Sequence, residues 1–156
     1  MRTKILLSVA ALCWTPLLVA GNKPGYPTEK IAEFVIAKLD VTSLPSGFRP
    51  KKEQGKKAFV DYGFTAQSVN ESEAVMEEAG GVKKLSIKVL DQNSSGIYVC
   101  VGELGQNGAE IKTQSVILLK RKNPTALLKG HESIREFAAC PVIGGSDSAA
   151  DPNGGD

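Results

Sequence analysis

The alternation of apolar and polar positions predicts strands in the second half of the chain. Every second residue of 85–89 is apolar, which is typical of a strand with one buried face. The almost continuous apolar stretch 97–101 predicts a central strand, and 111–120 predicts a strand with a deeply buried end. The turn-forming segments 91–96 and 102–108 are too short for crossovers, so these strands are expected to be antiparallel neighbours.

The first half of the chain and its C-terminal part are expected to be more helical. Apolar residues recur at three- and four-residue spacing in 27–40, which predicts an amphipathic helix. Residues 68–79 begin with capping-box patterns and end before a pair of glycines, so they predict a second helix. Residues 58–64 alternate and predict a strand, whereas 132–139 predict a last short helix.

This order of elements predicts an α+β fold. We expect a small antiparallel sheet of about four strands, covered by the N-terminal helix and one or two short helices. No internal repeat is present, and the short connections late in the chain disfavour a parallel β-α-β arrangement.

The N-terminal segment 1–21 is interpreted as a cleavable signal peptide. It has a short basic start and then an apolar run that is too short to span a bilayer. The run closes on small residues, so cleavage is expected before Asn22, with cleavage after Ala20 as the alternative. Residues 22–143 are then expected to form one globular domain, and the Gly-, Ser- and Asp-rich stretch 144–156 a disordered tail.

Removal of this leader changes the charge balance. The chain carries 19 basic and 17 acidic residues, and residues 1–21 include Arg2 and Lys4 but no acid, so 19 − 2 = 17 basic and 17 acidic residues remain. The remaining chain is neutral, and its composition therefore gives no support to a nucleic-acid partner. It holds no further apolar run long enough to be a transmembrane segment. A periplasmic or secreted location is expected.

The cysteine pattern agrees with export. Cys13 lies in the leader, which leaves Cys100 and Cys140 as the two cysteines of the exported chain. An even number of cysteines in an oxidising compartment predicts that they form a disulfide. Such a bridge would stabilise the fold by about 4 kcal/mol on the chain-entropy model. Two reduced, buried cysteines are the alternative.

One segment resembles the E and F strands of immunoglobulin domains, in which a tyrosine corner precedes the second cysteine. The resemblance covers about 16 residues and is carried by Leu85, Ile87, Leu90, Gly96, Tyr98 and Cys100. It implies a β-sandwich used for adhesion or recognition. The sequence departs from the family because no cysteine lies upstream after the leader, and the only tryptophan, Trp14, lies within it.

Signatures of catalysis are weak, so we expect a protein that is not an enzyme and has no cofactor or metal. The single histidine, His131, is followed by Glu132, but Arg135 stands where a zinc-protease helix has its second histidine. No G-x-S-x-G motif presents a nucleophilic serine. The acidic residues are interpreted as a solvated face, although a small carboxylate-dependent hydrolase remains an alternative; they are Glu71, Glu73, Glu77 and Glu78.

Basic residues crowd two segments. The first is a loop flanked by proline and glycine, and its members are Arg49, Lys51, Lys52, Lys56 and Lys57. The second and weaker group comprises Lys120, Arg121, Lys122 and Lys129. Residues of a surface loop do not contribute to the hydrophobic core, so clustered charge there indicates a binding surface for an anionic partner. The alternative is that this charge serves only solubility.

These observations favour an exported binding protein of the cell envelope or secreted fraction. We expect an inhibitor, an immunity-type protein or an envelope-associated factor, whose partner is a protein or an anionic envelope component and not a nucleic acid. An immunoglobulin-like adhesion module is the first alternative function.

Overall fold

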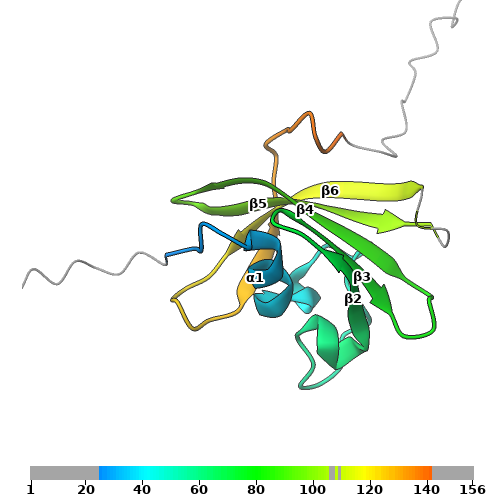
Figure 1. Cartoon of the computed structure of the whole chain (residues 1–156). Coiled ribbons are helices and arrows are strands. Elements are labelled where there is room, and N and C mark those ends of the chain that lie inside the picture. Colours follow the sequence, from blue (N-terminus) through cyan, green and yellow to red (C-terminus); the bar gives the residue numbers. More distant parts are fainter. Residues whose placement is uncertain (1–24, 106–107, 109, 142–156) are drawn as a thin grey trace, which may run out of the picture.

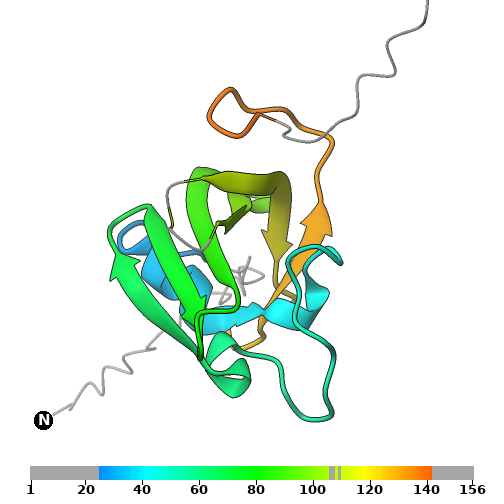
Figure 2. The ribbon, with the colours of Figure 1, turned by 90° about the vertical axis from the view of Figure 1, so that its right-hand side faces the viewer.

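The fold is one curled seven-stranded sheet that wraps around an α-helix (Figures 1 and 2). It is seen in a computed structural model, which describes residues 25–105, 108 and 110–141. The helical elements are α1 (Ile31–Lys38) and the 3-10 helices η1 (Val41–Ser43) and η2 (Phe59–Tyr62). The strands are β1 (Leu39–Asp40), β2 (Phe64–Val69), β3 (Glu73–Glu78), β4 (Lys84–Asn93), β5 (Gly96–Leu104), β6 (Ile111–Lys120) and β7 (Leu128–Glu132).

The strand order of the sheet is β1-β7-β6-β5-β4-β3-β2. Strands β2 to β7 follow one another as antiparallel neighbours, whereas β1 pairs parallel to β7. The short strand β1 follows α1 directly, so the chain leaves the helix and joins the sheet edge beyond β7. This connection places residues 39–43 beside residues 128–132, which are far away in the sequence.

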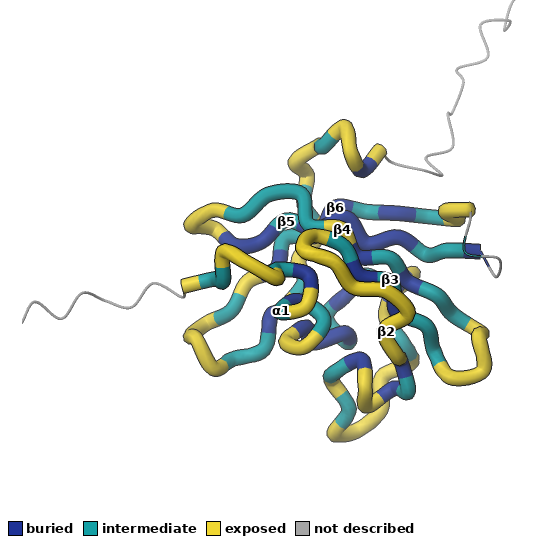
Figure 3. The backbone as a smooth tube through the Cα atoms, in the orientation of Figure 1, coloured by how far each residue is buried: buried dark blue, intermediate teal, exposed yellow. Residues whose placement is uncertain are grey.

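The concave face of the sheet and α1 form the main core. The inward positions alternate along the central strands, and Ile87 of β4, Val99 of β5 and Ile117 of β6 have no solvent exposure. Val35 of α1 is equally buried and packs into the same cluster. Figure 3 shows the buried positions along these strands and the exposed loops around them.

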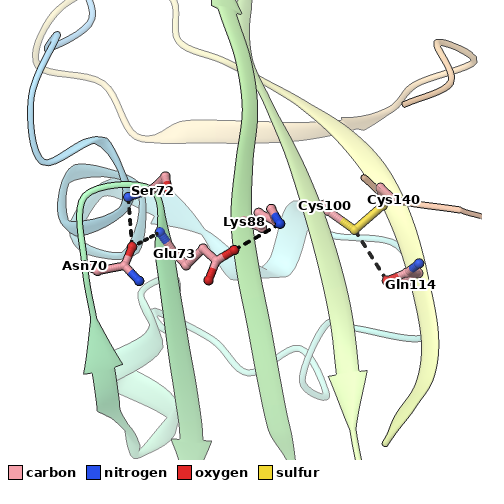
Figure 4. Close-up of polar contacts among 7 residues, drawn as sticks. All are labelled: Asn70, Ser72, Glu73, Lys88, Cys100, Gln114 and Cys140. Atoms are coloured by element: carbon pink, nitrogen blue, oxygen red, sulfur yellow. Dashed lines mark hydrogen bonds and ion pairs between the residues drawn. A yellow bond between two sulfur atoms is a disulfide. The ribbon is translucent and has the colours of Figure 1, made fainter. Parts of the chain in front are cut away.

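The outer face of the sheet carries a smaller core under a C-terminal strap, residues 133–141. Cys100 of β5 forms a disulfide with Cys140 of the strap (Figure 4). The Arg135 guanidinium lies over the Tyr98 and Phe137 rings, 5.1 and 4.7 Å from their centres. The strap is therefore held by a covalent bond and by cation–π contacts, and the predicted disulfide is confirmed.

Several predicted elements are confirmed at least in part. The strands expected at 85–89, 97–101 and 111–120 lie within β4, β5 and β6, which are antiparallel neighbours as expected. The helix expected over 27–40 is formed in its central part by α1.

The predicted fold class is wrong. The sheet has seven strands instead of about four, it is mixed instead of antiparallel, and among the described residues α1 is the one α-helix that packs on it. The largest error is at 68–79, where the predicted helix is replaced by the β2–β3 hairpin. The Asn70 side chain accepts hydrogen bonds from the backbone N–H groups of Ser72 and Glu73, at 3.0 and 2.8 Å (Figure 4). The pattern that can cap a helix closes a turn here.

Two further elements differ from the prediction. Residues 58–64, expected to be a strand, hold η2, which ends at Gly63 in a left-handed conformation before β2 begins. Residues 132–139, expected to be a helix, continue from the end of β7 into the strap, because the disulfide draws this segment across the outer face.

The structure also differs from the sandwich that the immunoglobulin resemblance implies. The described strands form a single sheet, and Cys100 bonds to the C-terminal strap instead of to a strand of a second sheet. Tyr98 stacks on Phe137 of this strap, with ring centres 5.5 Å apart.

Candidate functional site

The fold brings the two basic groups of the sequence together at one edge of the sheet. Lys129 of β7 pairs with Asp40 of β1 on one side and with Lys120 of β6 on the other. On the far side of β1, the Val41 N–H donates to the Lys57 carbonyl over 2.8 Å. Lys57 and Lys120, which are 63 positions apart in the sequence, are thus separated only by β1 and β7.

A central hollow of about 550 Å³ opens between these residues. Its lining includes five lysine and arginine side chains and consists of Asp40, Lys57, Lys120, Arg121, Lys122, Ala126, Leu127, Lys129 and His131. Residues of both predicted basic groups therefore meet in one hollow, together with the only histidine.

Two further hollows continue from the central one. A middle hollow of about 530 Å³ shares Asp40, Lys57 and Lys129 with it and is also lined by Lys52, Lys56 and the acidic Glu53. A distal hollow of about 390 Å³ shares Lys52 with the middle one. The distal hollow is lined by Thr42, Ser46, Arg49, Pro50, Lys51 and Lys52. All five residues of the predicted basic loop line one or two of these hollows.

Seven of these cations are exposed and form what we call the basic face: Arg49, Lys51, Lys52, Lys57, Lys120, Lys122 and Lys129. Within the described ranges, none of them lies within 4.0 Å of a carboxylate. Lysines of the opposite half of the sheet do form ion pairs, for example Lys84 with Glu77 and Lys88 with Glu73, the latter shown in Figure 4. The uncompensated positive charge is therefore concentrated at the β1–β7 edge.

Two members of the predicted basic groups do not belong to this face. The Lys56 ammonium lies 2.7 Å from a Glu53 carboxylate oxygen and 5.4 Å from the centre of the Tyr62 ring. The hydrogen bond with Glu53 raises the pKa of Lys56 above its usual value. Lys56 is thus engaged within its own loop.

Arg121 is the second such residue. Its guanidinium lies over the rings of Tyr26 and Phe34, 5.1 and 5.0 Å from their centres. It also donates to the carbonyl oxygens of Pro124 and Gly25. These contacts fix the segment before α1 to the end of β6, so the charge of Arg121 serves the fold.

The backbone of Lys57 is held from two sides. The Asp61 carboxylate accepts hydrogen bonds from the Lys57 and Ala58 N–H groups, at 2.9 and 2.8 Å, and these bonds lower the pKa of Asp61. The Lys57 carbonyl accepts from Val41 on the opposite side. The exposed Lys57 side chain therefore projects from a fixed position between the central and middle hollows.

Asp40 is a buried residue of this site, only 6% exposed, and it is not among the residues predicted from the sequence. Its carboxylate accepts from the Thr42 N–H and hydroxyl, at 3.2 and 2.6 Å, and so caps η1. The Ser43 hydroxyl donates to the Asp40 carbonyl and accepts from the Gly130 N–H, which ties β1 to β7. The signal that could have identified it is an aspartate two residues before a threonine, a pattern typical of a capped turn.

Other candidate residues do not form a site together. Glu71 accepts a hydrogen bond from the Lys30 N–H, and Glu73 and Glu77 pair with different lysines. Within the described ranges, no three His, Cys, Asp or Glu side chains come close enough to hold a metal ion. The predicted signal peptide and the predicted tail 144–156 lie outside the described residues.

Comparison with protein-family models, with curated proteins and with solved structures finds no match to this chain. Within the described ranges, no helix has the length and apolar character needed to cross a bilayer. The interpretation of the site therefore depends on its own geometry and charge.

Proposed function

We propose that the protein is an exported, non-enzymatic binding protein that holds an anionic partner on the basic face. The observation that carries the proposal is the convergence of two basic segments on adjacent hollows, where the seven cations of the basic face have no carboxylate within 4.0 Å among the described residues, although Asp40 and Glu53 also line the hollows. A loop and a strand pair far apart in sequence contribute to the same surface, so the charge density arises from the fold and not from a local run of lysines.

The energetics of the β6–β7 pair supports this proposal. Lys120 and Lys129 are direct cross-strand partners, and like charges in that relation destabilise a sheet. Lys57 adds a third positive charge to the same hollow. An anion bound between these ammonium groups would offset their repulsion, so the partner would stabilise the fold as it binds.

The proposed export rests on the predicted leader 1–21 and is compatible with the Cys100–Cys140 disulfide, because such bonds persist in oxidising compartments. The proposed absence of catalysis is supported by the chemistry of the central hollow. Acid–base catalysis by carboxylates requires two acids with separated pKa values, whereas Asp40 is the one carboxylate of this hollow and caps a turn.

A charge-matched pair of variants tests the proposal. K57S/K120S/K129S removes three charges from the basic face, and K30S/K88S/K112S removes three exposed lysines from elsewhere. We expect the first variant to lose at least about tenfold in affinity for dextran sulfate, measured by calorimetry at low salt, because each lysine contributes a counterion-release term. The control variant should lose less than about twofold.

Both variants should keep the cooperative thermal transition of the natural protein, since all six side chains are exposed. Equal losses in the two variants would show that only net charge matters, and the basic face would then not be the binding site.

A further inference from the structure

The three hollows of the basic face follow one another and share the residues that separate them. The central and middle hollows share Asp40, Lys57 and Lys129, and the middle and distal hollows share Thr42 and Lys52. Their shared lining residues place them in a row from the β6–β7 connection, past β1, to the loop before η2, and we call this row of hollows the basic groove. Each of the three parts has at least two members of the basic face in its wall.

We propose that this groove binds a linear polyanion that carries repeated phosphate, carboxylate or sulfate groups along a flexible backbone. This inference rests on the proposed function and specifies the partner. The groove crosses the strands: from Lys57 to Lys120 it spans β1 and β7, three strand spacings or about 14 Å. A compact anion would occupy one hollow and leave the other cations without a partner, whereas a polymer meets them all.

The residue types that line the groove disfavour a nucleic acid or a folded protein as its occupant. Single-stranded nucleic acids are held by aromatic side chains on which bases stack. Protein interfaces likewise depend on Trp and Tyr anchors, together with Arg. The lining residues of the three hollows include no Phe, Tyr or Trp. A polymer of charged groups without bases requires no such platform.

A bilayer surface is also disfavoured. Proteins that bind membrane surfaces combine basic residues with exposed apolar side chains that enter the interface. The exposed large apolar side chains of the described residues are Val60, Val69, Val82, Ile111 and Ile134. None of them lines the groove.

The length dependence of binding tests the inference. The purified protein is titrated at low salt with inorganic phosphate, tripolyphosphate, and polyphosphate of about 15 and about 60 units, at equal phosphate concentration. We expect the affinity per phosphate to rise at least about tenfold between tripolyphosphate and the 15-unit chain, because linked charges bind with a high effective concentration. It should then level off once the groove is filled.

The two ends of the groove provide matched variants. R49S/K51S/K52S changes only the middle and distal hollows. It should weaken the 15-unit chain about tenfold and change tripolyphosphate less than twofold, because the short anion needs only the central hollow. The groove proposal would be contradicted if this variant weakened both ligands equally. It would also be contradicted if tripolyphosphate had the same affinity per phosphate as the longer chains.

Further ligands distinguish which kind of polymer carries the negative charges that the groove binds. Alginate and dextran sulfate of similar charge number test a polysaccharide against polyphosphate, and tight binding of any of the three supports a linear polyanion. Tighter binding of a single-stranded oligonucleotide or of vesicles containing anionic lipid would contradict it. Binding that depends on the basic face but not on the length of the polymer would contradict only the proposal of a groove for linear polyanions. Absence of binding to every anion would contradict the proposed function as well.

Discussion

At the scale of single residues, the exposed charge of the basic face depends on buried or hydrogen-bonded neighbours. Lys57 is exposed, yet its backbone is fixed by the Asp61 carboxylate on one side and by Val41 on the other. Asp40, which lines the same two hollows as Lys57, caps the turn that carries Thr42. A small number of short polar contacts thus determines where the lysine side chains emerge.

The Asp61 contact predicts a dependence on pH. The pKa of Asp61 is lowered from 3.8, so its ionised form stabilises the folded state above about pH 4, and this contribution is lost as the pH falls through the lowered pKa. Asp61→Asn keeps an oxygen acceptor without the charge. We expect this variant to have a lower Tm than the natural protein at pH 7, with the difference shrinking as the pH falls through the lowered pKa of Asp61. Calorimetric scans across this range check it, and a difference that persists in acid would contradict the assignment.

Gly96 lies where β5 begins, in close contact with β6. Its φ is +148°, and a Cβ built there would be 2.3 Å from the Leu119 carbonyl oxygen. We expect Gly96→Ala to cost about 3 kcal/mol or more, since backbone atoms must move apart, and to lower the Tm by more than about 10 °C. Gly47→Ala is the control, because no atom lies within 4 Å of its added Cβ. Similar Tm values for the two variants would show that the β5–β6 contact is not restrictive.

At the scale of elements, one short sequence pattern is compatible with two different structures, a helix cap and a hairpin turn. Asn70 followed by Glu73 can cap a helix, but here it closes the β2–β3 hairpin. Ala74 and Met76 are buried on β3 and alternate with half-buried neighbours, which matches the period of a strand. The choice between the two depended on pairing with β4, a contact that local sequence does not reveal.

The C-terminal strap is an element without regular structure, and the disulfide holds it in place. The two cysteines are 40 residues apart, so the chain-entropy model predicts a contribution of about 4 kcal/mol. We expect C100A/C140A to lower the free energy of unfolding by about this amount in urea titrations. Its transition should match that of the natural protein under reducing conditions, and a loss below about 1 kcal/mol would mean that the strap contributes little.

At the scale of the whole molecule, the charges are arranged unevenly although they nearly balance. Without the predicted leader 1–21 the chain carries 17 basic and 17 acidic residues, yet the described ion pairs lie mainly away from the β1–β7 edge. A neutral protein can therefore present a strongly positive surface on one side.

This asymmetry predicts the salt dependence of binding. Binding to dextran sulfate is measured at several salt concentrations, and the logarithm of the affinity is plotted against the logarithm of the salt concentration. The slope for K57S/K120S/K129S should be smaller in magnitude than that for the natural protein by about two to three, because each lost lysine removes about one released counterion. K30S/K88S/K112S should keep the natural slope. A common slope for all three proteins would mean that the basic-face lysines do not contact the polymer.

The sequence by itself determined the local features: the three central strands, the centre of the first helix, the disulfide and the two basic segments. Each follows from periodicity, composition or cysteine count within a short stretch of chain. Only the tertiary structure decided that β1 joins β7, that 68–79 form a hairpin, and that Lys57, Lys120 and Lys129 share one hollow. These features depend on pairing between distant segments, and the free energy of such pairing is a property of the assembled sheet instead of any one segment.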